Sequence, residues 1–291
     1  RLVQMAGVVP GDIAQMAFGY GMFTGGFGLH YGLQRLGCAM IPAGSGNTER
    51  HIQMIEDYGT TVLVATPSYA MHICEVGEKM GYDWERSPLR VGLFGGEPCP
   101  PGLKAEIERR MHIVCTDNYG LTEVMGPGVS GECLAERYQQ HIAEDHFLWE
   151  VIDPETGEPV GEGEMGELVL TPLCKQGIPV LRYRTHDLTA VHTEPCACGR
   201  TLARMDKVRS RSDDMLIIRG TNVFPSQIED VLTGIEEVTP HYHIIVETRG
   251  GMDVLIVETE LRPEAFRDSF EAMDALRARI AEKLDRKSTR L

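Results

Sequence analysis

Short apolar runs recur along the first 120 residues, and stretches with a helical spacing of apolar positions lie between them. The runs at 61–65, 90–94 and 112–115 are continuous and bounded by polar or turn residues, a pattern typical of buried strands. The segments at 67–80 and 100–111 have the helical pattern, and the second carries proline in its first turn, where it costs no hydrogen bond. A further strand and a further helix are predicted at 39–42 and 48–58. This alternation of strands and helices predicts an α/β fold with a parallel sheet.

The segment at 11–36 combines a glycine-rich, helical pattern with aromatic residues. Glycine lets two backbones, or a backbone and a ligand, approach closely. Phe18, Tyr20 and Phe23 are therefore candidates for the wall of an apolar pocket. Tight packing between helices is the alternative, and the residues alone leave both interpretations open.

The pattern changes after about residue 130. Strands are predicted at 144–152, 166–172 and 187–192, and the connection between the first two is rich in turn-forming residues. Short strands joined by turns indicate a small β-rich subdomain over about 130–209.

A second unit is predicted to begin at about residue 210. Its elements are a strand, a helix, a β-hairpin and an amphipathic helix, at 215–218, 225–232, 242–260 and 263–284. The sequence thus predicts a large α/β domain over 1–209, which includes the β-rich subdomain, and a small α+β domain over 210–291.

Composition limits the classes of partner. The net charge of −15 argues against nucleic acid or an anionic membrane surface as a partner. No apolar run approaches the ~18 residues that a membrane span needs, so we expect no membrane partner. Eight cysteines in 291 residues are too sparse for a disulfide scaffold, which favours reduced thiols and a cytoplasmic location.

The stretch at 117–128, DNYGLTEVMGPG, places an aromatic ring, a hydroxyl and a carboxylate close together after a predicted strand. Its glycines and proline predict an irregular loop, and loops at the carboxyl ends of strands in open α/β sheets are common ligand sites. Thr122 can donate to an anion and Glu123 can ligate a hard cation, which suits phosphate and Mg²⁺ together. A surface loop with one exposed glutamate is the alternative.

Three motifs in this order resemble the core signatures of the adenylate-forming enzymes: the stretch at 117–128, YRTHDL at 183–188 and RSRSDDMLIIRGTN at 209–222. Fuller matches to one branch lie at 19–32, 92–98, 117–129, 144–160, 182–189 and 213–229. Over about 1–285, the sequence resembles phenylacetate-CoA ligase and its aryl-CoA ligase relatives.

The resemblance implies an ATP-dependent ligase that joins an aryl acid, with phenylacetate as first candidate, to coenzyme A through an acyl-adenylate. ATP/AMP, Mg²⁺ and coenzyme A are the implied cofactors and co-substrates, a mobile C-terminal domain is implied by the fold, and a homodimer is the family's common form. Two alternatives remain open: an aryl-acid adenylating enzyme that loads a carrier protein, and a non-catalytic homologue that binds nucleotide.

The resemblance also implies catalytic roles for individual residues. Thr122 is expected to donate to the α-phosphate, Glu123 to ligate Mg²⁺, and Arg211 to supply a fixed positive charge near ribose and phosphate. Asp187 is expected to accept hydrogen bonds from both ribose hydroxyls. Asp213 occupies the family's hinge position between the two domains.

The remaining implied roles concern binding. The residues expected to line the purine are Gly95, Gly96, Glu97, Pro98 and Tyr119. The residues expected to line the acyl pocket are Phe18, Tyr20, Phe23, Met125 and Gly126. Gly220 is expected to face the channel for the pantetheine arm of coenzyme A. His186 stands where much of the superfamily has glycine, and its role is left open.

The two ends of the chain lead to a further expectation. The chain opens in mid-pattern at Arg1 and has no Ser/Thr/Gly-rich phosphate loop, while the family's C-terminal lysine would lie beyond Leu291. Residues 286–291 match neither the preceding helix nor the family's usual ending. We therefore expect a fragment that cannot complete adenylation efficiently, although the parent enzyme could.

Four residues are candidates for a structural zinc site. Cys196 and Cys198 form a CxC pair, and Cys133 and His141 lie eight residues apart further upstream. Such a set can make a closed tetrahedral site, although the spacing is not that of a standard zinc finger. Some relatives of phenylacetate-CoA ligase carry cysteine and histidine at matching positions, which favours zinc. The alternative is that these cysteines are reduced and merely buried.

Overall fold

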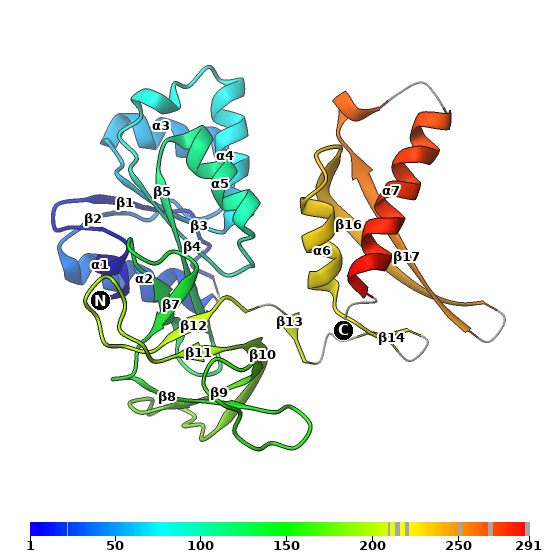
Figure 1. Cartoon of the computed structure of the whole chain (residues 1–291). Coiled ribbons are helices and arrows are strands. Elements are labelled where there is room, and N and C mark those ends of the chain that lie inside the picture. The colour runs from blue at the N-terminus through cyan, green and yellow to red at the C-terminus, as the bar shows by residue number, and fades with distance from the viewer. Residues whose placement is uncertain are drawn as a thin grey trace. The chain divides into compact units, whose positions relative to one another are not determined.

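The computed structural model divides into two compact units, Arg1–Val208 and Arg209–Leu291, which we describe separately (Figure 1). The structure describes residues 1–21, 23–208, 210–212, 216–218, 221–249, 252–266 and 270–288.

The first unit contains a main sheet whose strands, among the described residues, run in the order β11-β12-β7-β6-β5-β4-β3-β1-β2. One part of it is parallel throughout and consists of β2 (Ala39–Ile41), β1 (Ile13–Met16), β3 (Val62–Ala65), β4 (Val91–Gly95) and β5 (Val114–Leu121). The predicted parallel α/β sheet is confirmed. The segment at 11–36 is not helical throughout, because β1 precedes its helix.

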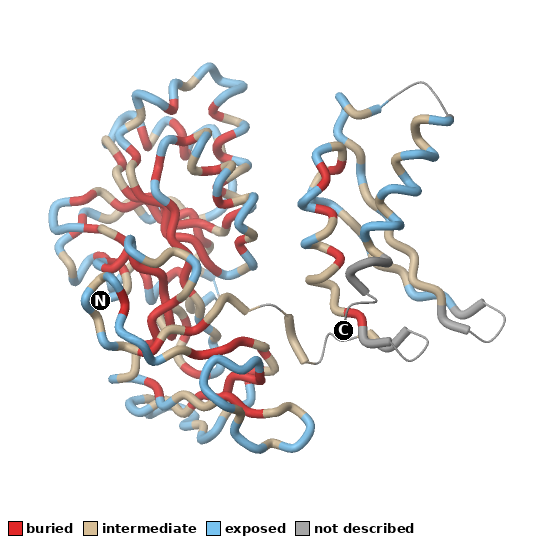
Figure 2. The backbone as a smooth tube through the Cα atoms, viewed as in Figure 1, coloured by how far each residue is buried: buried red, intermediate tan, exposed pale blue. Residues whose placement is uncertain are grey.

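Helices cover both faces of the parallel part. The helices on one face are α1 (Leu2–Met5) and α2 (Thr24–Leu36), and those on the other are α3 (Thr48–Tyr58), α4 (Pro67–Lys79) and α5 (Pro101–Met111), with a short 3₁₀ turn at Trp84–Arg86. Successive strand residues face opposite sides, so Leu63 packs on the α3–α5 side and Val64 on the α1–α2 side. Both are fully buried, and Figure 2 shows the buried positions concentrated in these strands.

The main sheet continues with antiparallel strands. These are β6 (Gly126–Glu132), β7 (Gln139–Ile142), β12 (Arg204–Asp206) and β11 (Val191–His192). The predicted irregular loop at 117–128 is therefore wrong in form. β5 extends to Leu121, residues 122–125 make a tight turn, and β6 begins at Gly126, with a bulge between Tyr119 and Gly120.

A second, antiparallel sheet contains β8 (Phe147–Ile152), β9 (Gly166–Pro172) and β10 (Tyr183–Thr189). The strand predicted at 187–192 is two strands in different sheets, because the chain leaves β10 after Thr189 and joins β12 through β11. The β-rich region after residue 130 thus divides between two sheets, and their apolar side chains share one core cluster.

The second unit has its own small core, formed by Val223, Ile228, Leu232, Ile235 and Val238. Its elements are β13 (Ser210–Arg211), β14 (Leu216–Ile218), β15 (Thr221–Val223), α6 (Pro225–Thr233), β16 (Val238–Arg249), β17 (Met252–Leu261), a 3₁₀ turn (Pro263–Ala265) and α7 (Phe270–Ser288). The predicted β-hairpin is confirmed as β16 and β17. The predicted helix at 263–284 begins later, at Phe270, after the 3₁₀ turn.

In the described part of the chain, every helix is too short or too polar to cross a membrane.

Candidate functional site

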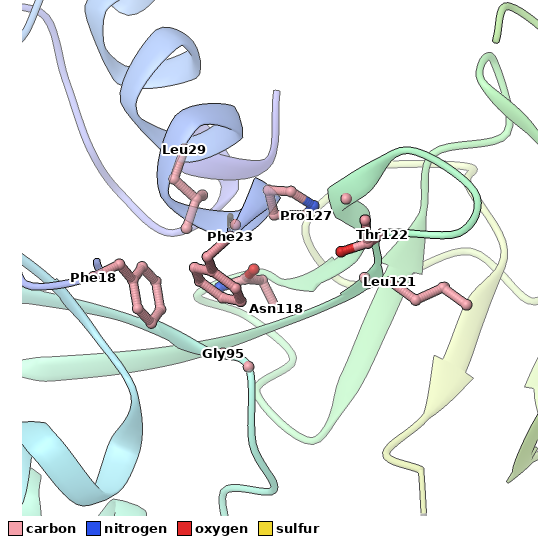
Figure 3. Close-up of a pocket in the computed structure, with 12 residues that line it drawn as sticks. Phe18, Phe23, Leu29, Gly95, Asn118, Leu121, Thr122 and Pro127 are labelled. Atoms are coloured by element: carbon pink, nitrogen blue, oxygen red, sulfur yellow. The ribbon is translucent and has the colours of Figure 1, made fainter. Parts of the chain in front are cut away.

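A pocket opens where β4 and β5 end, beside the N-terminal turn of α2 (Figure 3). Five groups of residues from distant parts of the chain line it: Phe18; Phe23, Gly25 and Leu29 of α2 and its cap; Gly95 and Gly96; Asn118 with residues 120–122; and Gly126 and Pro127 of β6. Six of the predicted site residues meet here, namely Phe18, Phe23, Gly95, Gly96, Thr122 and Gly126. The carboxyl end of a parallel sheet is the expected place for such a site.

Aromatic rings form one wall of the pocket. Phe18 is buried, and its ring meets the edge of the Phe23 ring with their centroids 5.3 Å apart. Leu29 and Pro127 complete the apolar side. Tyr20 does not line the pocket, because its ring packs against Phe27 and its hydroxyl lies 2.8 Å from His30 Nδ1.

The turn between β5 and β6 presents the polar groups. Thr122 and Glu123 are exposed, while Val124 is fully buried and anchors the turn in the core. Lys175, from the connection between β9 and β10, donates a hydrogen bond to the carbonyl of Glu123. Gly120 is required by the turn, since a Cβ atom there would lie 2.2 Å from the carbonyl oxygen of Gly126.

The motif Gly95–Pro98 is fastened on two sides. A Cβ atom on Gly95 would lie 2.7 Å from the carbonyl oxygen of Asn118, so only glycine permits this approach of β4 to β5. The Glu97 carboxylate accepts a hydrogen bond from the backbone N–H of Ser68 at 2.6 Å, in the first turn of α4. Gly96 has φ +83°, and Pro98 is exposed.

Two residues predicted to hold purine and ribose are in direct contact. The Tyr119 hydroxyl donates to Asp187 Oδ2 at 2.5 Å, although the two residues are 68 positions apart. The backbone N–H of Asp187 donates to Thr185 Oγ1 at 3.1 Å, and this hydrogen bond helps to hold Asp187 in place on β10.

His186, which stands where much of the superfamily has glycine, has a backbone conformation that favours glycine. Its φ is +63°, in the left-handed region that favours glycine. Its backbone N–H donates to the buried Glu167, and its ring Nδ1 lies 3.6 Å from the same carboxylate. Glycine at this position would adopt the same backbone without strain.

The other predicted residues lie elsewhere or are not described. Met125 packs into the core shared by the two sheets. Arg211 lies on β13 in the second unit. Asp213 and Gly220 fall outside the described residues.

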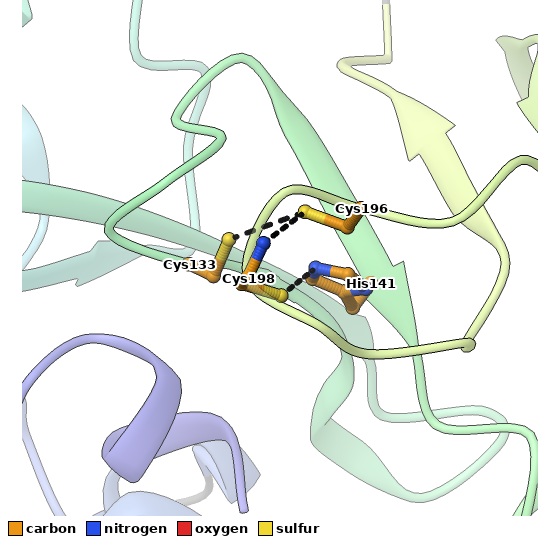
Figure 4. A group of neighbouring side chains, drawn as sticks. All are labelled: Cys133, His141, Cys196 and Cys198. Atoms are coloured by element: carbon orange, nitrogen blue, oxygen red, sulfur yellow. Dashed lines mark hydrogen bonds between the residues drawn. The ribbon is translucent and has the colours of Figure 1, made fainter.

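The four candidate zinc ligands meet at the antiparallel end of the main sheet (Figure 4). The ligand atoms of Cys133, His141, Cys196 and Cys198 all lie within 4.8 Å of one another. Cys133 Sγ is 3.8 Å from Cys196 Sγ, and Cys198 Sγ is 3.5 Å from His141 Nε2. A tetrahedral site with bonds of about 2.0–2.3 Å separates its ligand atoms by roughly 3.4–3.8 Å, so these distances fit zinc.

The thiols in this cluster differ in their proton affinity. Burial raises the pKa of Cys133 to about 11. Burial also acts to raise the pKa of Cys198, but hydrogen bonds from Arg200 and from the thiols of Cys196 and Cys133 outweigh it and lower the pKa to about 7. Burial lowers the pKa of His141, which favours the neutral imidazole that a metal needs.

The motifs alone did not point to three residues around the pocket. Asn118 fastens β5 to β4 by donating to the carbonyl of Phe94. Lys175 and Lys207 are lone lysines in connecting segments, where a lysine is normally solvated. Lys207 lies between the carboxylates of Asp117 and Glu132, a signal that appears only in the folded chain.

Two family models match the chain. The model of the AMP-binding enzyme family matches residues 12–172, and that of the AMP-binding enzyme C-terminal domain matches residues 220–289. The chain belongs to the AMP-binding enzyme family. Its predicted membership in the adenylate-forming superfamily is thereby confirmed.

Curated relatives place the chain in one branch of the family. It is 44% identical to phenylacetate-coenzyme A ligase of Thermus thermophilus, over 98% of this chain and 66% of that protein. It is 47% identical to phenylacetate-coenzyme A ligase of Escherichia coli, over 90% of this chain and 60% of that protein. These identities confirm the predicted phenylacetate-CoA ligase branch. The chain spans about 60–66% of the length of these relatives.

A solved structure matches the fold. The 2-hydroxyisobutyryl-CoA ligase, crystallised in the postadenylation state with R3-HIB-AMP, superposes with a TM-score of 0.89 at 26% identity. The match covers 99% of this chain and 62% of that one. The predicted fold class, an α/β domain with a small C-terminal domain, is confirmed.

Proposed function

We propose that the protein to which this chain belongs joins an aryl carboxylic acid, with phenylacetate as first candidate, to coenzyme A in an ATP-dependent, AMP-forming reaction. The observation that carries the proposal is one pocket that holds both an aromatic wall, Phe18 and Phe23, and the turn with Thr122. Similarity to phenylacetate-coenzyme A ligases supports the choice of acid and of acceptor.

The chemistry assigns a distinct task to each part of the site. A carboxylate is a poor electrophile. Its oxygen therefore attacks the α-phosphate of ATP, which breaks the bond to the β-phosphate, releases pyrophosphate and forms an acyl-adenylate. The thiol of coenzyme A then attacks the acyl carbon, and AMP leaves. Such a transfer depends on positioning and on donors aimed at the phosphate oxygens. Thr122 is exposed at the turn and can supply one donor. The apolar wall holds the ring of the acid and keeps water from it.

The nucleotide is the proposed ligand of the Tyr119–Asp187 pair. Their hydrogen bond places an aromatic ring next to a carboxylate, and a carboxylate can accept hydrogen bonds from ribose hydroxyls. We assign Gly95–Pro98 to the purine and Arg211 to the ribose and phosphate. Asp213 as the hinge and Gly220 at the pantetheine channel stay predictions from the family pattern.

Glu123 is the proposed ligand for Mg²⁺. Its side chain is exposed on the turn beside Thr122, and a carboxylate is the protein ligand that this hard cation prefers. A cation bound there would offset the charge of the phosphates.

The test is pyrophosphate release by the protein encoded by the complete gene, with ATP, Mg²⁺ and a panel of aryl and alkyl acids. Release that depends on phenylacetate, and that Glu123→Gln abolishes, would support the proposal. Glu56→Gln, on an exposed position of α3, is the control and should leave the rate unchanged. Release that any alkyl acid supports equally would contradict the aryl specificity.

The same assay separates the two alternatives. Acid-dependent pyrophosphate release without any CoA thioester would favour loading of a carrier protein. A folded protein that binds ATP but releases no pyrophosphate with any acid would favour a non-catalytic homologue. A cytoplasmic location and a homodimer stay predictions, which cell fractionation and sedimentation velocity would test.

We also propose that Cys133, His141, Cys196 and Cys198 bind a structural Zn²⁺. Four protein ligands complete a tetrahedral shell and leave no position for a reactive water. Held there, the ion would fasten the connection after β6 to the segment between β11 and β12. One zinc per chain by elemental analysis, lost in Cys198→Ser, would support the site, and metal-free protein of unchanged stability would contradict it.

A further inference from the structure

Four charged side chains form a cluster that includes Asp117, the neighbour of the pocket residue Asn118 on β5. We call it the buried ion cluster: the buried Lys104, Asp117 and Glu132, and the half-buried Lys207. Lys104 Nζ lies 2.5 Å from Glu132 Oε2, and both side chains are at least 96% buried. Lys207 Nζ lies 3.2 Å from Glu132 Oε1 and 3.3 Å from Asp117 Oδ2. The backbone N–H of Asp117 also donates to Glu132 at 2.8 Å. Two lysines therefore face two carboxylates.

Stability alone gives a poor reason for this cluster. Removing charges from water costs several kcal/mol for each ion, and apolar residues of similar volume are often as stable as a buried pair. Burial acts to lower the pKa of Lys207, but Asp117 and Glu132 outweigh it and raise the pKa, so the lysine stays charged. Because removing these charges from water costs free energy, the cluster is best explained by a role in holding particular chain segments in place.

Lys207 joins the segments that carry the nucleotide candidates. Its Nζ donates to the carbonyl of Cys99 at 3.2 Å, the residue directly after Gly95–Pro98. Its partner Asp117 lies two residues before Tyr119 on β5. One ammonium group thus connects the purine motif to β5, the strand that carries Tyr119.

Lys104 also contacts Glu132, but unlike Lys207 it makes its other contacts away from the segments that carry the nucleotide candidates. Its second hydrogen bond runs to the carbonyl of Arg137 at 2.9 Å, and its ammonium lies 5.6 Å from the ring of Tyr138. Both contacts are on the connection between β6 and β7, at the other side of the cluster. Lys104 therefore offers a matched control: an equally charged and more deeply buried lysine with the same carboxylate partner.

We propose that Lys207 is a positioning residue for the nucleotide, which sets the distance between the Gly95–Pro98 motif and the Tyr119–Asp187 pair by bridging Cys99, Asp117 and Glu132. This inference rests on the nucleotide site of the proposed function. It requires no contact between Lys207 and the ligand, because the lysine acts through the backbone of two segments.

The test compares Lys207→Met with Lys104→Met in the protein encoded by the complete gene. We expect Lys207→Met to raise both the KM for ATP and the Kd for AMP by about tenfold or more, and to leave the KM for the acid within about twofold. Lys104→Met should lower the unfolding temperature at least as much, yet leave the Kd for AMP within about twofold. Lys207→Arg, which keeps the charge, should recover part of the affinity.

If Lys207→Met does not fold, Lys207→Gln replaces it in the comparison. Glutamine has no charge, but it can still donate a hydrogen bond to the carbonyl of Cys99. An unchanged Kd for AMP in the folded Lys207 variants would overturn the proposal. Equal weakening by Lys104→Met would also overturn it, because the effect would then be general destabilisation.

AMP binding by equilibrium dialysis needs no turnover, so it separates this proposal from the ligase function. A parent that binds AMP but never releases pyrophosphate would refute the ligase function, and the comparison of the lysines would still decide the role of Lys207. A parent that binds no AMP would refute both.

Discussion

The parallel part of the main sheet and its antiparallel extension bury different kinds of side chain. In the parallel part, the interior strand residues such as Leu63, Val64 and Phe94 are apolar and fully buried. In the extension, Glu132 and His141 are each 1% exposed and depend on specific partners. An apolar core tolerates any side chain of suitable volume, whereas a buried polar group is costly unless its partner is present.

This difference concerns function, because the pocket lies where the two parts meet. β5 belongs to both: it pairs in parallel with β4 and antiparallel with β6. On one side Phe18 closes the pocket with apolar surface. On the other side the buried ion cluster ties β5 to β6, because the backbone N–H of Asp117 donates to Glu132. The parallel part therefore forms the apolar scaffold of the pocket, and the polar contacts of the extension hold the backbone beside the pocket in place.

The largest expected loss of stability comes from comparing two cysteine substitutions, one in the antiparallel extension and one in the parallel part. If the proposed zinc is bound, Cys133→Ser should remove it and lower the free energy of unfolding by several kcal/mol, since structural zinc contributes about 10–16 kcal/mol in small zinc-binding peptides. Cys38→Ser, at a buried position directly before β2, should cost only about 1 kcal/mol, because serine can also donate to the carbonyl of Val9. Elemental analysis with urea unfolding of the chain tests both. Equal losses of stability would contradict the contrast between the two parts.

The second-largest expected loss of stability comes from a cavity made in the parallel part. Phe94→Ala removes a fully buried ring and should cost about 3–5 kcal/mol. The loss is apolar, so the difference from the parent should be the same at pH 5 and pH 7, by urea unfolding at both. A loss that changes between these two values would show that the parallel part also depends on buried charge.

Asp117, on β5 where the two parts meet, should give the buried ion cluster a pH dependence that the apolar core of the parallel part lacks. Burial raises its pKa to about 6 from an ordinary value near 3.8, so the folded state binds more protons than the unfolded state between these values. This carboxyl therefore reduces the parent's stability as pH rises from about 4 to about 6, by at most about 1.4 kcal/mol per pH unit.

Asp117→Asn removes this titration. The stability of the variant relative to the parent should therefore increase as pH rises from 4 to 6 and become constant above, as measured by urea unfolding along a pH series. Phe94→Ala is the control without such a slope. A relative stability that falls with rising pH would reverse the sign and refute the assigned burial effect.

The smallest expected effect concerns backbone strain beside the Tyr119–Asp187 pair. A non-glycine residue in the left-handed region costs about 1–2 kcal/mol, and glycine returns about 0.5–1 kcal/mol of that through the entropy of the unfolded chain. His186→Gly should therefore raise stability by under about 1 kcal/mol. His186→Ala loses the ring but keeps the strain, so it should be less stable than His186→Gly in the same thermal melt.

Sequence patterns predicted the parallel part well for a physical reason. Its strands are buried on both faces, so they appear as continuous apolar runs such as 61–65, and its helices have apolar residues at helical spacing. The predicted helix at 48–58 matches α3 residue for residue. The second unit was predicted from the same signals, apart from the later start of its last helix.

The antiparallel extension escaped prediction because its strands are short and polar. β6, GPGVSGE, contains three glycines and a proline, which predict a loop, yet it forms a strand along β5. β7 is QQHI, whose burial depends on partners from β6 and β12. Tertiary pairing overrides local preference in such strands.

Apolar periodicity and residue identity are local properties, so the fold class, the family motifs and the chemical types of the candidate site could be predicted from them. Which of these residues meet is a property of the folded chain. Packing places Phe23 but not Tyr20 at the pocket, joins Tyr119 to Asp187, gathers four zinc-ligand candidates and sets Lys207 between two carboxylates. Contacts between residues far apart in the chain depend on strand pairing and packing, which no local pattern encodes.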